Sequence, residues 1–455
     1  MRRFLSLFCI AAMLMAQTPA FADSGNGMNL IRDAEIESDL RKMIYPILNQ
    51  AGIDPTSFRL YILQNNDLNA FVAGGQNIFL HTGLLIRSEN YAQVMGVVAH
   101  EAGHISGGHL ARSKETMQDI GKETLLLQAL AAAAMALGQG QAGAAVMSAG
   151  AQWFQRSTLA YTRTQERSAD QAGIKFLTDL GVSPQGLLDF FKILQNEQKI
   201  LVDKANPYLQ THPLTNERID AIAAYLNDHP DLRDKGLNDK TMAEAHRRIR
   251  AKLIGYLLQP DQVEKYYPDS DQSFAAMYAR AIMNHRRGEA EKSLDLITNL
   301  IKQEPNNPYL YELRGQVYRE TPGSNHNPDT YIAAYAKSVE LAPQEPLLRL
   351  GLVQALLDRG NETDVQQALS HLQEILRLEP RYGLAWQMES IAEGKAGYIG
   401  KSALALSELG LLRGDKKRAK DQAERAVKLL KDDPIALQRA EDIKNQIQIE
   451  EKDKK

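Results

Sequence analysis

The sequence predicts a two-part chain of mainly helical α+β class, in which helices with a small sheet precede an all-helical domain of repeats. Between residues 57 and 81, alternating apolar residues indicate short strands, and an apolar helical pattern follows over about 91–111. Further along, proline-marked helix ends recur at intervals of 38 and 37 residues, at Pro305, Pro343 and Pro380. This interval is close to the ~34 residues of a tetratricopeptide repeat.

Length and composition limit the possible functions. At 455 residues the chain is too long for one ordinary domain, so two or three are expected. With 44% hydrophobic and 24% charged residues it can bury sizeable cores. The formal net charge of −3 argues against a general nucleic-acid-binding protein, which would carry a basic excess.

The first 22 residues have the features of an export signal. Arg2 and Arg3 form a positive start, the apolar run 4–16 is too short to span a bilayer, and Ala20-Phe21-Ala22 is a small-residue cleavage site. Its removal would take away Cys9, the only cysteine, so the mature chain would contain no disulfide. An oxidising compartment such as the periplasm suits a chain of this kind.

The mature chain is expected to divide into a mixed domain over 23–258, a linker over 259–273, helical repeats over 274–436 and a charged tail over 437–455. The mixed domain should open with a helix over 29–51. Three to four repeat units are expected, and the alternative is a helical bundle without repeats. Repeats of this kind form concave surfaces for peptides and partner proteins.

The most apolar part of the mature chain is 125–151, which the segment Gly138-Gln139-Gly140-Gln141 interrupts. The first apolar block is too short to cross a membrane. An alanine-rich helical hairpin packed on the mixed domain is the simplest interpretation. The alternatives are a mobile flap over a cleft, or a surface that makes peripheral contact with a membrane.

The motif His100-Glu101-Ala102-Gly103-His104 lies within the predicted helix over 91–111. At about 100° per residue, His100 and His104 fall on one helix face with Glu101 at its edge. Two imidazoles placed in this way can hold one Zn²⁺, and the neighbouring carboxylate can transfer a proton. The motif occurs by chance in some chains, so other residues have to support it.

A catalytic zinc usually has three protein ligands, and two patterns can supply the third. A third histidine would have to stand at position 110, which is leucine. His109 lies nine residues after His100, about 180° round a continuous helix, so it should face away from the metal, either at the surface or behind a ligand that it supports. The other pattern is a later glutamate followed four residues on by an aspartate, as in Glu166 and Asp170. Glu166 could then bind the metal, while Asp170 accepts the free N–H of a ligating histidine.

Several motifs occur together in one order: Asn69-Ala70-Phe71 before a glycine pair, Thr82-Gly83-Leu84-Leu85, the HEAGH segment, Glu166-x-x-Ala169-Asp170, and Thr211-His212-Pro213. In this the chain resembles the gluzincin zinc metalloproteases of the HtpX and BepA type. The resemblance rests on specific motifs over about 30–230 and on architecture alone for the remainder. It implies a zincin-type metalloprotease domain followed by a tetratricopeptide-repeat solenoid.

The resemblance also implies residue roles. One Zn²⁺ per chain would be held by His100, His104 and Glu166, with Glu101 as general base and then general acid. Asn69, Ala70 and Phe71 would begin an edge strand along which an extended substrate adds its backbone. His212 would lie near the metal as a regulatory residue or fourth ligand, although a helix-capping or core histidine is the plain alternative. Arg218 could pair with an acid near the site.

The implied function is that of a periplasmic zinc endopeptidase, which hydrolyses unfolded or misassembled envelope and outer-membrane proteins. Its repeats would dock substrates or an outer-membrane assembly complex. The alternative is a chaperone-like assembly scaffold that acts through its repeats with little or no proteolysis.

Overall fold

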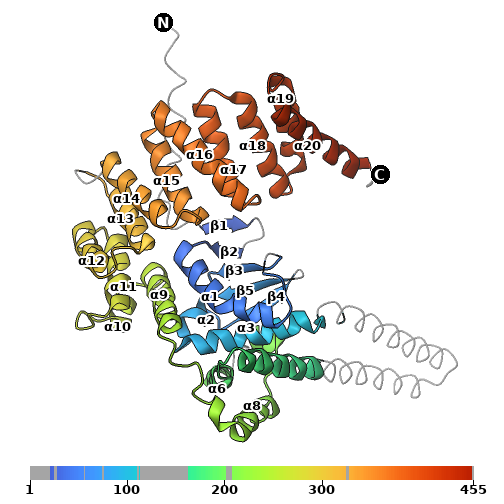
Figure 1. The fold of residues 1–455 in the computed structure, drawn as a ribbon, viewed down its shortest axis with the longest axis vertical. Coiled ribbons are helices and arrows are strands. Elements are labelled where there is room, and N and C mark those ends of the chain that lie inside the picture. Colours follow the sequence, from blue (N-terminus) through green and yellow to red (C-terminus); the bar gives the residue numbers. More distant parts are fainter. Residues whose placement is uncertain are drawn as a thin grey trace, which may run out of the picture. The chain divides into compact units, whose positions relative to one another are not determined.

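The computed structural model describes residues 21–24, 28–55, 57–73, 76–109, 112, 162–200, 207–323 and 327–452 (Figure 1). These residues fall into two compact units. The N-terminal unit contains residues 29–31 and 36–250, and the repeat unit contains 32–35 and the chain from Ala251 onward, together with the residues up to Met28. The predicted fold class is confirmed, because a small sheet with helices precedes a long series of helices.

The N-terminal unit contains a short mixed sheet. Its strands lie in the order β2 (Met28–Ile31), β3 (Arg59–Leu63), β5 (Asn77–His81) and β4 (Ala70–Ala73). β3 pairs with β5 in parallel, whereas β4 runs antiparallel to β5 with Phe71 opposite Phe79. β4 is the last strand in this order. A further strand, β1 (Phe21–Ser24), is assigned to the repeat unit.

Helices make up most of the N-terminal unit. They are α1 (Ala34–Gln50), α2 (Thr82–Arg87), α3 (Tyr91–Ser106), an α-helix over 162–179, α6 (Gln185–Ile200), α7 (Pro207–Thr211), α8 (Asn216–Asp228), the 3₁₀ helix η1 (Pro230–Leu232) and α9 (Lys240–Leu257). The first two residues of α1 and the part of α9 from Ala251 onward belong to the repeat unit. α3 is buried from Tyr91 through His104, as its apolar sequence predicts. It ends at Ser106, earlier than predicted, because Gly107 caps it and Gly108 has a positive φ of 62°.

Two glycines allow the helix over 162–179 to lie very close to α3. A Cβ atom added to Gly103 would lie 2.7 Å from the backbone oxygen of Ala169, and one added to Gly173 would lie 3.1 Å from the backbone of His100. Larger residues at these positions would push the helices apart. The close approach brings the side chains of the later helix within reach of those on α3.

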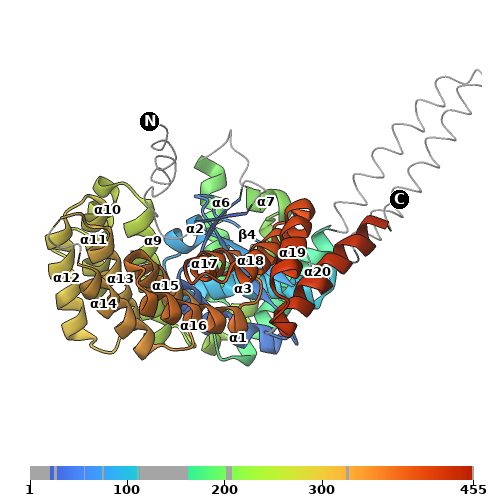
Figure 2. The same cartoon turned by 90° about the horizontal axis from the view of Figure 1, so that it is seen from above.

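The repeat unit consists of α10 (Pro260–Tyr266) followed by five consecutive helix pairs among its described residues (Figures 1 and 2). The pairs are α11 (Phe274–Arg286) with α12 (Ala290–Gln303), α13 (Pro308–Glu320) with α14 (Pro328–Leu341), α15 (Pro346–Arg359) with α16 (Glu362–Leu378), α17 (Gly383–Lys395) with α18 (Ile399–Leu412), and α19 (Lys416–Leu429) with α20 (Pro434–Lys452). Three of the predicted helix ends recur with one geometry, since Glu304, Ala342 and Glu379 cap their helices with φ near −131°, −139° and −127°.

The ends of the repeat region differ from the expected boundaries. Helix α10 lies where a linker over 259–273 is predicted; Pro260 begins it, a capping box from Gln259 stabilises it, and Val263 is buried. Most of the predicted tail over 437–455 lies in α20. The reason is a set of apolar residues at helical spacing that pack against α18 and α19: Ala440, Ile443 and Ile447.

The apolar stretch 125–151 lies outside the described residues, and so do residues 1–20 of the predicted export signal. Among the helices that the structure describes, none combines the length and apolar character that a membrane span requires.

A pair of acids on α17 leads to a stability prediction. Glu389 and Glu393 are one turn apart, and one carboxylate oxygen of each is buried without a hydrogen bond among the described residues. Burial, reinforced by the charge of Glu393, raises the pKa of Glu389 from 4.5 to about 7. The unfolded chain therefore loses this proton first, so stability falls as the pH rises from about 4.5 to 7.

We expect Glu389→Gln to stabilise the repeat unit by up to about 3 kcal/mol at pH 8, with the gain shrinking towards pH 5. Glutamine removes the buried charge and keeps the shape. Urea unfolding followed by the fluorescence of Trp386 on the same helix, in a Trp153→Phe background, measures the effect. A gain independent of pH would contradict the ionisation argument.

Candidate metal centre

α3 places His100 and His104 one helical turn apart with Glu101 beside them. All three side chains are buried, His100 and Glu101 almost completely. The two Nε2 atoms point toward each other and lie 3.1 Å apart. Their convergence on one point is the arrangement expected from the HExxH spacing.

The helix over 162–179 brings two carboxylates to the same point. Oε2 of Glu166 lies 3.3 Å from His100 Nε2, and Oε1 lies 3.3 Å from His104 Nε2. One turn later, Asp170 Oδ1 lies 2.9 Å from Nδ1 of His100. The structure thus brings both carboxylates, singled out by their spacing in the sequence, against the HExxH histidines.

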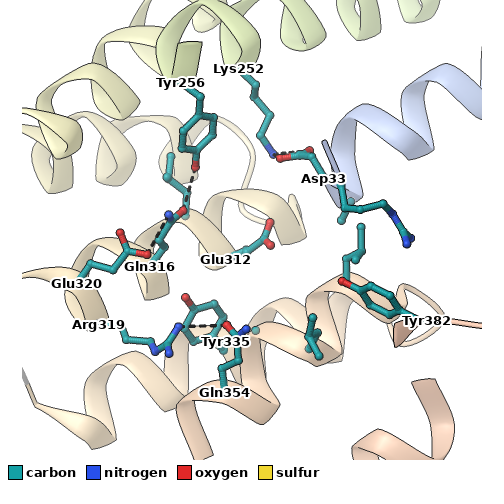
Figure 3. A pocket seen from close by; sticks show the side chains of 16 residues that line it. Asp33, Lys252, Tyr256, Glu312, Gln316, Arg319, Glu320, Tyr335, Gln354 and Tyr382 are labelled. Atoms are coloured by element: carbon teal, nitrogen blue, oxygen red, sulfur yellow. Dashed lines mark hydrogen bonds and ion pairs between the residues drawn. The ribbon is translucent and has the colours of Figure 1, made fainter. Parts of the chain in front are cut away.

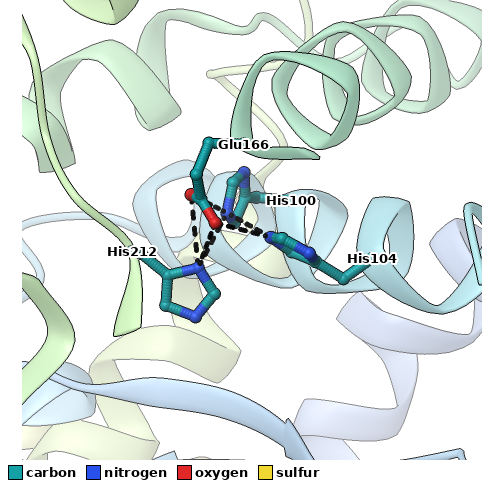
Figure 4. Close-up of side chains that lie close together, drawn as sticks. All are labelled: His100, His104, Glu166 and His212. Carbon is teal, nitrogen blue, oxygen red and sulfur yellow. Dashed lines mark hydrogen bonds and ion pairs between the residues drawn. The ribbon is translucent and has the colours of Figure 1, made fainter. Parts of the chain in front are cut away.

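His212 completes a cluster of four side chains (Figure 4). It follows α7, and its ring stacks on Tyr208 at 4.7 Å between centroids. Its Nδ1 atom lies 3.1 Å from Glu166 Oε1 and 3.4 Å from His100 Nε2. One ligand atom from each of His100, His104, Glu166 and His212 lies within 4.8 Å of the other three.

These distances fit a zinc ion. Ligand atoms about 2.0–2.1 Å from a tetrahedral zinc stand about 3.4 Å from one another. The contacts among the four residues, between 3.1 and 3.4 Å where they are hydrogen-bond or ion-pair distances, match that edge length. With a metal bound, His100 would donate its Nδ1–H to Asp170 and direct its Nε2 lone pair at the ion. Converging lone pairs and a carboxylate are a ligand set that a cation stabilises.

Glu101 has no hydrogen-bond partner among the described residues, although both of its carboxylate oxygens are buried. The nearest ionisable contact is His212 Nε2, 3.5 Å from Oε1. Burial raises the pKa of Glu101, and the charges of His212 and His100 oppose this shift. An unsatisfied buried carboxylate is costly unless a bound group uses it. Its position at the edge of the cluster is where a proton acceptor for a water molecule would be needed.

The pKa values of the two α3 histidines move apart without a metal. Burial alone would lower the pKa of His100, but hydrogen bonds to Asp170 and Glu166 raise it to about 9. Burial lowers the pKa of His104 to about 4, despite the opposing effect of Glu166. Burial would also raise the pKa of Glu166, yet the three histidines hold it well below its usual range. Glu166 is therefore a carboxylate available to a cation.

Arg218 on α8 supports the carboxylates, and the sequence alone could not assign its partner. The guanidinium donates to both oxygens of Asp170, at 2.7 and 2.8 Å, and lies 2.9 Å from Glu166 Oε2. It also donates to the Pro213 carbonyl and stacks over the Phe191 ring at 4.7 Å. A bidentate contact of this kind fixes the orientation of Asp170, which in turn orients His100.

His109 does not face away from the site as the helical-wheel argument predicts. Because α3 stops at Gly107 and Gly108, the chain turns back and buries His109 with its Nδ1 atom 3.0 Å from Nδ1 of His104. The direction predicted for His109 was wrong because it assumed a continuous helix, whereas a position beside a metal-ligand candidate is one of the two that were expected. The two adjacent glycines at the end of the motif were the signal in the sequence.

The position of His109 suggests that it fixes the tautomer of His104, by accepting the Nδ1–H and leaving Nε2 for the metal. We expect His109→Ala to weaken zinc binding by roughly 10–100-fold, whereas His109→Asn, whose Oδ1 can occupy the same place, should retain most of the affinity. Competition with a zinc chelator measures this, and His229→Ala at an exposed position is the control. Equal affinities for the alanine and asparagine variants would contradict the assignment.

The predicted substrate strand lies at the edge of the sheet. Ala70 and Phe71 belong to β4, and the carbonyl of the buried Asn69 accepts a hydrogen bond from His81. β4 also contacts α3, the helix that carries the HExxH motif. The half-buried rings of Phe71, Phe79 and Tyr61 form a stack. The centroid of the Phe79 ring lies 4.8 Å from that of Phe71 and 4.8 Å from that of Tyr61.

Comparisons with known proteins agree with this arrangement. Residues 31–226 match the model of peptidase family M48, which is a zinc metalloprotease family. The beta-barrel assembly-enhancing protease of Escherichia coli is 24% identical over 342 residues, 75% of this chain and 69% of that protein. A putative beta-barrel assembly-enhancing protease of Vibrio cholerae is 26% identical over 63% of this chain, and the match spans 59% of the length of that relative. The metalloprotease YcaL of Escherichia coli is 24% identical over 47% of this chain and 78% of its own.

Proposed function

We propose that this chain, whose residues 31–226 match the model of peptidase family M48, is a zinc-dependent endopeptidase that cleaves unfolded or misassembled proteins of the bacterial envelope. The observation that carries the proposal is the convergence of His100, His104 and Glu166 beside the unsatisfied carboxylate of Glu101. The similarity to beta-barrel assembly-enhancing proteases supports the substrate class.

Each residue has a defined task in this proposal. His100, His104 and Glu166 hold one zinc, which supplies a Lewis acid that polarises the scissile carbonyl and lowers the pKa of a water toward ~7. Glu101 takes the proton of the attacking water and delivers it to the leaving amine. Asp170, held by Arg218, keeps His100 in the tautomer that presents Nε2.

The substrate would bind in extended form along β4, adding its backbone from Asn69 through Phe71. The terminal position of β4 in the strand order supports this, because an edge strand offers backbone groups with which another strand can pair. Binding through the main chain requires no particular side chains and favours unfolded polypeptide. Binding of an uncleaved peptide to a Glu101→Gln variant should slow amide hydrogen exchange in β4. Protection that spares β4 would rule out this binding mode.

His212 would act as a gate at the metal. Its Nδ1 atom lies as close to Glu166 and His100 as a fourth ligand would, so it would occupy the position that an attacking water requires. We propose that it closes the resting site and moves away when a substrate arrives, which would keep the enzyme latent among other envelope proteins.

We expect His212→Ala to raise basal cleavage of a denatured protein several-fold and to lower zinc affinity. Both effects follow from the removal of a fourth ligand that competes with water. Cleavage rates at saturating zinc, together with chelator competition, provide the two measurements. If neither changes, His212 is a structural residue stacked on Tyr208 and the gating role fails.

The repeats would dock substrates or an outer-membrane assembly complex, and the location would be the periplasm. Paired helices over 274–452 support the docking role, since repeat arrays present extended binding surfaces. The features of residues 1–22 support export.

The proposal is tested with purified mature chain and a urea-denatured outer-membrane protein. Cleavage should disappear with 1,10-phenanthroline and return when zinc is added back. Aggregation of the same substrate should be followed in parallel. Suppressed aggregation without cleavage at any zinc concentration would instead favour a chaperone-like scaffold.

A further inference from the structure

A polar cavity lies within the repeat unit, remote in sequence from the metal centre (Figure 3). Its volume is about 100 Å³, well above the roughly 10–15 Å³ that a single water needs. It is bounded by the inner helices α13 and α15, by α9, and by the segment 32–34. The lining includes the rings of Tyr256, Tyr335 and Tyr382.

The cations that line the cavity already have acidic partners. Lys252 contacts Asp33 at 2.8 Å and Glu35 at 3.4 Å. Arg319 pairs with Asp358 at 2.6 Å. In the same way, both oxygens of Glu379 accept from Arg32 at 3.0 Å. Among the described residues, these pairs leave no lining cation unmatched.

Glu312 on α13 is the exception among the acids. Its carboxylate projects into the cavity, and it makes no hydrogen bond or ion pair with any described residue (Figure 3). Glu320, the other acid that α13 contributes, is engaged by His285 Nε2 at 2.9 Å. Glu312 is therefore the one lining acid without a cationic or hydrogen-bond partner among the described residues, and the same lining contains aromatic rings. Such a site favours a positively charged ligand.

We propose that this cavity binds a single ammonium or guanidinium group, presented by a lysine or arginine side chain of an extended polypeptide, with Glu312 as its partner. The polypeptide source is favoured by the setting, because the lining comes from successive helices of a repeat array that also carry the amides of Gln316 and Gln354. The proposal rests on the docking role proposed for the repeats and gives it a chemical preference.

The buried position of Glu312 makes the proposed binding depend on pH. Burial raises the pKa of its carboxyl to about 8; Lys252 opposes the shift, whereas Asp33, Glu35 and Glu345 reinforce it. The other charged residues that line the cavity are Arg32, Arg319 and Glu320. A bound cation stabilises the carboxylate, so binding releases a proton, and affinity should rise about tenfold between pH 7 and pH 9.

The test uses the full mature chain carrying Glu101→Gln, so that bound peptides are not cleaved. Fluorescein-labelled Gly/Ser peptides carry one central lysine, arginine or glutamine, and fluorescence anisotropy measures their binding. We expect the lysine and arginine peptides to bind about tenfold more tightly than the glutamine peptide. Glu312→Gln should abolish this preference, whereas Glu340→Gln, the same charge change at an exposed position of α14, should preserve it.

A preference for lysine that survives Glu312→Gln, or no preference in the parent protein, would overturn the proposal. A peptide affinity that does not rise with pH would also overturn the proposal, and this measurement requires no further variant. If butylammonium binds as tightly as the lysine peptide, the inference that a polypeptide presents the ammonium group is wrong. Because the assay measures binding alone, its failure would leave the proposed protease chemistry untouched.

Discussion

Replacing Glu101 with glutamine is expected to lower the rate of peptide-bond cleavage by roughly 10²–10⁴-fold while zinc stays bound. Glutamine has the same shape as glutamate, but it cannot accept a proton from the attacking water. The carboxylate that is lost is fully buried, and it has no hydrogen-bond partner among the described residues. Its replacement therefore breaks no hydrogen bond that holds the fold together.

The measurement compares kcat for a denatured protein substrate with zinc content and thermal melting of the same samples. Glu89→Gln, at an exposed position just before α3, controls for the loss of a negative charge. Undiminished cleavage by the Glu101→Gln variant would rule out the proposed protease mechanism. Loss of zinc together with cleavage would mean that Glu101 supports the metal and does not act on a proton.

Replacing Arg218 with alanine is expected to destabilise the N-terminal unit by about 3–5 kcal/mol. The guanidinium is buried and satisfies both oxygens of Asp170 as well as Glu166. Without it, the buried carboxylates of Glu166 and Asp170, one turn apart on the same helix, lose their permanent counter-charge. Zinc binding should recover part of the loss, because the ion neutralises Glu166.

A matched control for Arg218 lies across the same two helices. Arg167 on the helix over 162–179 pairs with Glu217 on α8 at 3.1 Å, but both side chains are more than half exposed. Arg167→Ala should therefore cost less than about 1 kcal/mol. Urea denaturation of both variants, with and without zinc, gives the comparison. Equal losses for the two variants would show that the buried contacts of Arg218 contribute nothing beyond those of a surface pair.

Sequence patterns predicted the fold where local periodicity determines it. The strands at 59–63 and 77–81 and most of α3 follow from their apolar spacing. The end of α3 was misplaced because the helical pattern was extended past Gly107 and Gly108, although glycine pairs commonly end helices. The many charged residues of α20 are typical of a tail, whereas the spacing of Ile443 and Ile447 indicates a helix packed on a neighbour.

Residue spacing predicted those parts of the candidate site in which two side chains share one helix. His100 and His104, and likewise Glu166 and Asp170, each share a face of one helix, which four-residue spacing alone indicates. The approach of the two helices depends on Gly103 meeting Ala169, a tertiary contact without a local signature. For the same reason the sequence could not decide which acid Arg218 holds, or that His109 returns to contact His104.

The central claim is that one zinc is held by His100, His104 and Glu166 beside Glu101. Anomalous diffraction at the zinc edge from crystals of the purified chain tests it most directly. We predict one anomalous peak per chain, about 2.0–2.2 Å from Nε2 of both histidines and from a Glu166 oxygen. A zinc peak elsewhere, or none at this cluster in a sample that contains stoichiometric zinc, would contradict the account.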